Sequence, residues 1–245
     1  MVINFGRTNF LSSPLPLSSG PPTRVDLDLT PDPSWPITYR RLSTPAGHKV
    51  WYNVGTLCAF KIVDNKEVSL KDFRKLGDQM LVFTDGSCTD GLIGTSVVLY
   101  IDHTHVATLC YYLGSAEHHT VFKAEAVGLI LAARLQITRP ETSFPASILV
   151  DNQVVIRSGE RPTAKPGHYL LLHFRNLMHQ LHEEKDSSRE DVMVRWIAGH
   201  QEVKGNKVAD REAKLAVKGE AKSSPRHKLP SALQKHLPRR IPALK

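Results

Sequence analysis

The chain has 245 residues, of which 41% are hydrophobic and 23% are charged, a composition that is ordinary for a globular protein. It contains no run of about 18 apolar residues, so no membrane-spanning helix is expected, and the N-terminus lacks the pattern of a secretory signal. The three cysteines form no Cys-x-x-Cys pair, so neither a disulfide framework nor a thiolate zinc site is predicted, and we expect a reducing intracellular compartment.

The formal net charge of +8 is concentrated at the C-terminus. From Arg211 to Lys245 there are 10 Lys or Arg residues against 2 acidic residues, whereas the preceding 210 residues carry 22 of each sign. A basic tail of this kind favours contact with polyanions such as nucleic acid. A tail that is only soluble and disordered is the alternative, and the two interpretations are compatible. We expect residues 220–245 to be a basic, disordered tail.

The first part of the chain is rich in proline. Repeated prolines over residues 1–47 remove backbone donors and fix φ, so we expect an irregular extended arm there. Residues 48–64 alternate loosely and could form a hairpin around Asn53–Gly55, and residues 68–77 are expected to form a short helix. We therefore assign residues 1–78 to an irregular N-terminal extension, whose role the sequence leaves open.

From Met80 onward, three strands joined by two polar turns predict an antiparallel meander. The strands are Leu81–Thr84, Thr95–Ile101 and His105–Leu113, and the turns are Cys88–Gly94 and residues 102–104.

Helices and two buried strands follow the meander, as the spacing of apolar residues indicates. The helices are Thr120–Leu135, Asn152–Ser158, His168–Glu183 and one from Asn206, its N-cap, to about Lys218; the strands are Ser147–Asp151 and Asp191–Ile197. Right-handed crossovers then predict an α/β domain over residues 79–219, with helices on both faces of a mixed five-stranded sheet.

Acidic residues follow the apolar parts of two predicted strands. A crossover makes these strands parallel neighbours, so Asp85 and Asp151 are expected at the same edge of the sheet. Gly86 is expected to let the backbone turn after Asp85. Glu125 and Asp210 lie near the starts of helices that can pack over this edge. Each acid alone has an ordinary explanation, as a turn residue, a helix cap or a surface residue, and only their combined placement favours a site.

Four carboxylates without a cation would repel one another strongly, because two unit charges ~4 Å apart cost about 4 kcal/mol at an effective dielectric near 20. Divalent metal would make such a cluster tolerable. Ligation by oxygen alone indicates Mg²⁺ or Mn²⁺ rather than zinc. Two such ions ~3.5–4 Å apart form the clamp that is used for in-line phosphodiester displacement.

Five short segments carry a family resemblance through their order, spacing and flanking residues. They are Phe83–Ser87, Lys123–Ala126, Val150–Gln153, Trp196–His200 and Asn206–Asp210. Over about residues 79–219 the chain resembles type 1 ribonuclease H, and it looks most like the ribonuclease H domains at the end of retrotransposon polyproteins.

The resemblance implies the roles of individual residues. Four acids would be ligands of two Mg²⁺ or Mn²⁺ ions: Asp85, Glu125, Asp151 and Asp210. His200 would sit on a mobile loop and assist proton transfer or product release, which suits an unperturbed pKa near 6.5. Three polar residues would contact phosphate, sugar or base in the substrate groove: Ser87, Gln153 and Asn206.

The resemblance further implies a metal-dependent endonuclease that hydrolyses the RNA strand of an RNA–DNA hybrid, leaving 5′-phosphate and 3′-hydroxyl ends. Three departures affect substrate recognition more than chemistry. Cys88–Gly94 is shorter than the family's turn, Thr120–Phe122 lacks a usual asparagine, and Pro166–Leu170 leads directly into a helix where some members carry a basic one. The alternatives are an inactive retroelement remnant that binds nucleic acid or only folds, and a related metal nuclease that acts on DNA.

Overall fold

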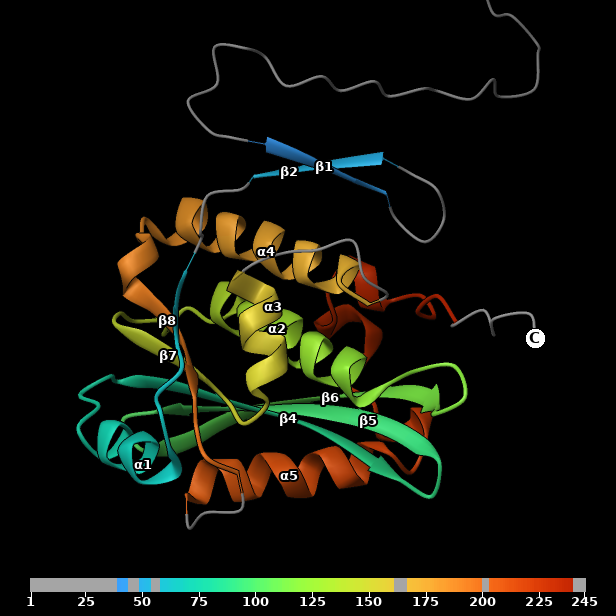
Figure 1. Ribbon diagram of the computed structural model, residues 1–245, viewed down its shortest axis with the longest axis horizontal. Coiled ribbons are helices and arrows are strands. Elements are labelled where there is room, and N and C mark those ends of the chain that lie inside the picture. The colour runs from blue at the N-terminus through green and yellow to red at the C-terminus, as the bar shows by residue number, and fades with distance from the viewer. Residues whose placement is uncertain (1–38, 44–48, 54–57, 161–166, 200–202, 240–245) are drawn as a thin grey trace, which may run out of the picture. The chain divides into compact units, whose positions relative to one another are not determined.

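A computed structural model describes residues 39–43, 49–53, 58–160, 167–199 and 203–239 of the chain (Figure 1). The strands are β1 (Tyr39–Ser43), β2 (Lys49–Asn53), β3 (Ala59–Lys61), β4 (Met80–Thr89), β5 (Leu92–Ile101), β6 (Thr104–Ser115), β7 (Ala146–Val150) and β8 (Val192–Trp196). The α-helices are α1 (Lys66–Arg74), α2 (Val121–Thr138), α3 (Gln153–Glu160), α4 (Tyr169–Lys185) and α5 (Lys204–Ala216). Among the helices in these ranges, none combines the length and the apolar character that crossing a bilayer requires.

The main sheet has six strands in the order β3-β8-β7-β4-β5-β6. β3, β8, β7 and β4 are parallel to one another, whereas β4, β5 and β6 form the antiparallel meander. The predicted α/β fold with a mixed sheet is therefore confirmed, with one strand more than expected. The additional strand is β3, which comes from the supposed N-terminal extension and pairs with β8 at the sheet edge.

The predicted hairpin around Asn53–Gly55 is wrong in its position. β2 ends at Asn53 and pairs in antiparallel fashion with β1, which precedes it, so that Tyr39 lies opposite Asn53. The loose alternation correctly indicated extended chain at Lys49–Asn53 and Ala59–Lys61. It could not identify the partner of each strand, because alternation fixes the strand period and not the pairing.

Helices cover both faces of the main sheet, with α2, α3 and α4 on one face and α1 and α5 on the other (Figure 1). The alternation of side chains along β4 divides the interior accordingly. Met80 and Val82 belong to the larger core with α2 and α4. Leu81 and Phe83 belong to a smaller core with α1 and α5. Because both faces are buried, β4 is an almost continuous apolar run until its first acid.

The turn predicted at Cys88–Gly94 is much shorter in the structure. β4 continues to Thr89 and β5 begins at Leu92, so only Asp90 and Gly91 connect them, with φ of 52° and 72°. Positive φ at both positions is the geometry of a tight two-residue hairpin, for which Asp-Gly is a favoured sequence. Asp102 and His103 make the second such turn, with φ of 45° and 62°.

The tail predicted to be disordered from residue 220 is instead packed over residues 220–239. It forms three short 3₁₀ turns, and Leu229, Leu233 and Leu237 are buried in the larger core. The N–H of Ser224 donates to the carbonyl of Cys110 on β6 at 2.9 Å. The tail therefore covers the edge of β6, which would otherwise present unpaired backbone groups. The prediction failed because it gave weight to the prolines and basic residues of the tail and overlooked three leucines spaced four residues apart.

This packing predicts that the tail contributes to stability. Leu233 is only 2% exposed, so Leu233→Ala should lower the free energy of unfolding by about 2–4 kcal/mol through lost burial and the cavity left behind. The exposed Lys228→Ala is the control and should change it by less than about 0.5 kcal/mol. Urea unfolding measures both. Equal effects of the two substitutions would contradict the packed tail.

Candidate metal centre

The site begins where the parallel pairing of two central strands stops. The last paired residues of β4 and β7 are Thr84 and Val150. Asp85 and Asp151 come next in each strand, so their carboxylates emerge together at one edge of the ladder. Asp85 is not at the end of its strand, however, because β4 continues to pair with β5, where Asp85 lies opposite Ser96.

Gly86 does not turn the chain, and the prediction of a turn there is wrong. An added Cβ would lie 3.0 Å from the Cβ of Ala124 and 3.1 Å from the backbone nitrogen of Glu125, both on α2. The glycine is therefore needed for the close approach of helix to strand. α2 is capped by Thr120, whose hydroxyl accepts from the N–H of Lys123 at 3.3 Å. This arrangement brings Glu125, in the first turns of the helix, down onto β4.

The structure brings three of the predicted acids together. Asp85, Glu125 and Asp151 each place a carboxylate oxygen within 4.8 Å of the other two, and we call these residues the carboxylate cluster. Asp85 and Glu125 are buried, and Asp151 is half-buried. Three acids so close and so poorly hydrated must repel one another unless protons or cations neutralise them.

The environment raises the pKa of Asp85 to about 7. Burial is the largest cause, and the charges of Asp151 and Asp210 raise the pKa further. The positive charge of Lys214 and the hydrogen bond from the N–H of Gly86 oppose this rise in part. At neutral pH and without a cation, Asp85 is therefore protonated in a large fraction of molecules.

Glu125 is perturbed in the same direction, and its pKa lies well above the ordinary value. Burial is again the largest cause, followed by the charges of Asp151 and Asp85. Hydrogen bonds from the N–H of Gly86 and the side chain of Asn152 favour the charged form and oppose the rise. These two donors therefore help to orient the Glu125 carboxylate within the carboxylate cluster.

The carboxylate cluster has the chemistry of a site for hard divalent cations. All of its donor atoms are oxygens, which suit Mg²⁺ or Mn²⁺. Oε2 of Glu125 is buried and has no hydrogen-bond partner among the described residues. A buried oxygen of this kind is costly unless something binds to it. The residues present therefore fit a bound divalent metal.

Asp210 is close to the carboxylate cluster without being part of it. It lies on α5 and is near enough to raise the pKa of Asp85. Its Oδ2 accepts a hydrogen bond from Nζ of Lys214 at 2.8 Å, and its side chain is 40% exposed. The predicted group of four acids is therefore present as three converging carboxylates and a fourth that is paired with a lysine one helical turn away.

The predicted substrate residues differ in their burial and in their hydrogen bonds. Ser87 is buried two residues after Asp85, so both point to the same face of β4. Gln153 begins α3, and its Oε1 accepts from Nη2 of Arg157 at 3.0 Å. Asn206 is not the N-cap of α5, which begins at Lys204. His200 lies outside the described residues.

Asn206 is one of the first residues of α5 and is 5% exposed. Its Oδ1 is buried and has no hydrogen-bond partner within the part of the chain that the structure describes. Val203 occupies the N-cap position. Its backbone is extended, and its side chain makes no capping hydrogen bond. The sequence misled because asparagine is a favoured N-cap, whereas here it lies inside the helix.

Two residues that hydrogen-bond members of the carboxylate cluster, Trp196 with Asp151 and Asn152 with Glu125, were not predicted to have this role. Nε1 of Trp196 donates to the carbonyl of Asp151 at 3.0 Å. Oδ1 of Asn152 accepts from the N–H of Val154 at 2.9 Å. Asn152 therefore caps the start of α3, a role that the sequence alone also allowed for Asp151. Trp196 and Asn152 both lie inside the segments that carry the resemblance, which is the only signal that could have identified them.

Comparison with known proteins identifies the family. The RNase H family profile matches residues 77–218, which is more than half of the chain. The protein belongs to the RNase H family. The search of curated protein sequences finds no match.

Solved RNase H structures are similar to this chain at low identity. The N-terminal RNase H domain of Rv2228c from Mycobacterium tuberculosis is 24% identical, with 58% of this chain and 95% of that chain covered and a TM-score of 0.41. RNase H1 from Halobacterium salinarum is 19% identical, with 57% of this chain and 97% of that chain covered and a TM-score of 0.41. A foamy viral protease–reverse transcriptase, solved in complex with an RNA/DNA hybrid, is 16% identical. The match covers 57% of this chain and 20% of that chain, with a TM-score of 0.46.

The raised pKa of Asp85 predicts how the metal-free protein responds to pH. The folded pKa is about 7, whereas the unfolded value is near 3.9. The folded state therefore keeps a proton that the unfolded state releases between these pH values. The free energy of unfolding should fall as the pH rises through this range, by up to about 1.4 kcal/mol per pH unit for one proton.

Urea unfolding in a metal-free buffer at about pH 5 and about pH 7 measures this effect. Asp85→Asn removes the titrating group, so the drop in stability between the two pH values should be smaller in the variant than in the wild type. The same drop in both proteins would show that Asp85 does not carry the proton.

The close packing at Gly86 gives a second prediction. Gly86→Ala should displace the start of α2, lower the free energy of unfolding by about 1–3 kcal/mol and weaken Mn²⁺ binding, because Glu125 moves with the helix. Gly77→Ala is the matched control, since an added Cβ there meets nothing within 4 Å. Urea unfolding and calorimetric Mn²⁺ titration compare them. Unaltered Mn²⁺ affinity in Gly86→Ala would contradict the proposed packing constraint.

Proposed function

We propose that the protein is a divalent-metal-dependent endonuclease that hydrolyses the RNA strand of RNA–DNA hybrids. The observation that carries this proposal is the carboxylate cluster, whose oxygens lie within 4.8 Å of one another. It occurs in a chain that belongs to the RNase H family. A non-enzymatic fold has no need of two buried acids in repulsive contact, since each costs stability at neutral pH.

The proposed ligands of two Mg²⁺ or Mn²⁺ ions are the carboxylate cluster and Asp210. Bound divalent ions supply positive charge for the reacting phosphate and lower the pKa of water. The chain's own part is to hold the ligand oxygens in place. Asn152 and the N–H of Gly86 donate to Glu125, and Trp196 donates to the backbone of Asp151 at 3.0 Å. Asp210, whose Oδ2 accepts from Lys214 in this structure, would complete the ligand set.

Further roles rest on the resemblance of the sequence segments. We propose that His200 transfers a proton or assists product release, and that three polar residues contact the substrate: Ser87, Gln153 and Asn206. We also propose that the protein is intracellular and that it descends from a retroelement.

A cleavage assay tests the activity and separates the alternatives. Incubating the full chain with Mg²⁺ and labelled RNA–DNA hybrid, duplex DNA or duplex RNA should give cleavage of the hybrid's RNA strand alone. Asp85→Asn should abolish cleavage, because it removes one ligand of the carboxylate cluster. Binding without cleavage of any substrate would support an inactive remnant, and cleavage of DNA would support a related DNA nuclease.

The packed tail is proposed to add nonspecific affinity for nucleic acid. Its exposed basic residues include Arg226, Lys228, Lys235 and Arg239. Their charges can approach phosphates, and each phosphate contact steepens the dependence of log K on log[salt] by about 0.7–0.9. Removing residues 220–239 would expose the edge of β6, so substitution of the charges is a cleaner test than truncation.

Replacing these four residues with glutamine should weaken hybrid binding at low salt and flatten the salt dependence. The Asp85→Asn background prevents cleavage during the titration. The matched control replaces four exposed basic residues on or beside α1 with glutamine: Lys66, Lys71, Arg74 and Lys75. Fluorescence anisotropy at several salt concentrations measures both. Equal affinities and slopes in the two variants would remove the tail from the binding surface.

A further inference from the structure

The segment just before the residues matched by the RNase H family is part of the sheet. β3 and α1 precede residue 77, where the match begins. β3 nevertheless pairs in parallel with β8, from Ala59↔Met193 to Lys61↔Arg195. Leu70 and Phe73 of α1 pack against the smaller core. This segment is therefore fixed against the strand whose end lies beside the carboxylate cluster.

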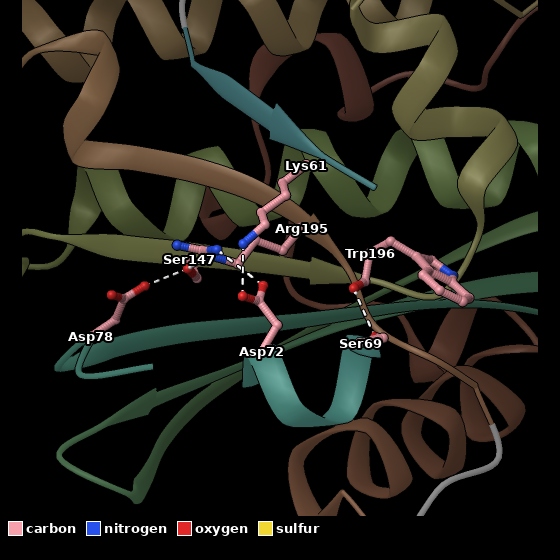
Figure 2. Close-up of polar contacts among 7 residues, drawn as sticks. All are labelled: Lys61, Ser69, Asp72, Asp78, Ser147, Arg195 and Trp196. Carbon is pink, nitrogen blue, oxygen red and sulfur yellow. Dashed lines mark hydrogen bonds and ion pairs between the residues drawn. The ribbon is translucent and has the colours of Figure 1, made fainter. Parts of the chain in front are cut away.

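Two ion pairs of Asp72 fix α1 further, as Figure 2 shows. Asp72 of α1 accepts from Nζ of Lys61 at 2.7 Å and from Nη1 of Arg195 at 3.4 Å. Nε of Arg195 donates to Oγ of Ser147 at 2.8 Å, and Ser147 donates to Asp78. Partly exposed ion pairs are weak individually. Together with the apolar packing, they join α1 to β3 and β8.

Ser69 lies on the buried side of α1 and is 2% exposed. Its hydroxyl donates to the carbonyl of Trp196 at 3.1 Å (Figure 2). It also accepts from the N–H of Ala198 at 3.0 Å. One hydroxyl therefore uses its donor and an acceptor site on two backbone groups at the end of β8.

These two bonds take the place of pairing with a neighbouring strand. In a parallel sheet, successive backbone groups point alternately to the two neighbours. The N–H of Ile197 points toward β7 and donates to Val150 at 2.9 Å. The carbonyl of Trp196 and the N–H of Ala198 therefore face the β3 side, where pairing has ended at Lys61. Without the Ser69 hydroxyl, the buried N–H of Ala198 and the partly buried carbonyl of Trp196 would lose these partners, which is costly.

The segment that Ser69 holds lies against Asp151 at two of its residues, Trp196 and Gly199. The indole of Trp196 donates to the carbonyl of Asp151 at 3.0 Å. Gly199 follows Ala198, and an added Cβ on it would lie only 2.9 Å from Oδ2 of Asp151. A shift of residues 196–199 would therefore move or crowd the carboxylate of Asp151.

We propose that Ser69 is a positioning residue for the candidate metal centre, because its hydroxyl fixes the end of β8 against which Asp151 is oriented. This inference rests on the proposed function in that Asp151 is taken as a metal ligand. It gives a residue outside the matched part of the family a role in the geometry of the site.

The test compares Ser69→Ala with Ser147→Ala in the full chain. Ser147 is a matched control, because it is also buried and hydrogen-bonded but lies at the opposite end of β7 from Asp151. Ser69→Ala should lower kcat on the hybrid about tenfold and raise the calorimetric Kd for Mn²⁺ by a similar factor, with KM within about twofold. Ser147→Ala should lower Tm while kcat and the Mn²⁺ Kd stay within about twofold.

Ser69→Cys preserves the size of the side chain but weakens both bonds, so its kcat and Mn²⁺ affinity should lie between those of wild type and Ser69→Ala. It also decides the outcome if Ser69→Ala fails to fold. Wild-type kcat and Mn²⁺ affinity in both Ser69 variants, or losses equal to those of Ser147→Ala at equal Tm, would overturn the inference. If the wild type binds Mn²⁺ but cleaves no hybrid, the proposed function fails, and the ratio of Mn²⁺ dissociation constants still decides the role of Ser69.

Discussion

The carboxylates of Asp85, Glu125 and Asp151 repel one another, and the packing around them has to offset this repulsion. These side chains converge because the parallel ladder of β4 and β7 stops one residue before Asp85 and Asp151, and because α2 packs closely enough to bring Glu125 onto β4. Burial then makes each charge expensive, which raises the pKa of Asp85 to about 7. A fold that keeps such an arrangement must stabilise it elsewhere and gain from it when a cation binds.

That stabilisation comes from apolar packing on both sides of the sheet. α2 is buried over almost its whole length, and α5 lies against β4 and β5 on the opposite face. Polar contacts then orient the acids individually: Asn152 acts on Glu125, Lys214 on Asp210, and Trp196 on Asp151. The sheet therefore provides rigidity, while single hydrogen bonds at its edge set the direction of each carboxylate.

Local patterns predicted much of this architecture. The apolar run before Asp85 and the alanine-rich spacing of α2 are signals contained within single elements, so their positions and the meeting of the acids could be inferred. The Asp90–Gly91 hairpin and the buried leucines of the tail also left local signals, but turn-forming and charged residues masked them. The pairing of β3 with β8 left none, because it joins distant residues. Ser69 is the clearest case, since its hydroxyl reaches a carbonyl 127 positions away.

Anomalous X-ray diffraction from crystals grown with Mn²⁺ would decide whether these acids form one metal centre. We expect anomalous peaks in contact with the carboxylates of Asp85, Glu125 and Asp151, with Asp210 turned from Lys214 toward one of them. Crystals that show no peak at these carboxylates at saturating Mn²⁺, or peaks only at other surface acids, would contradict this expectation.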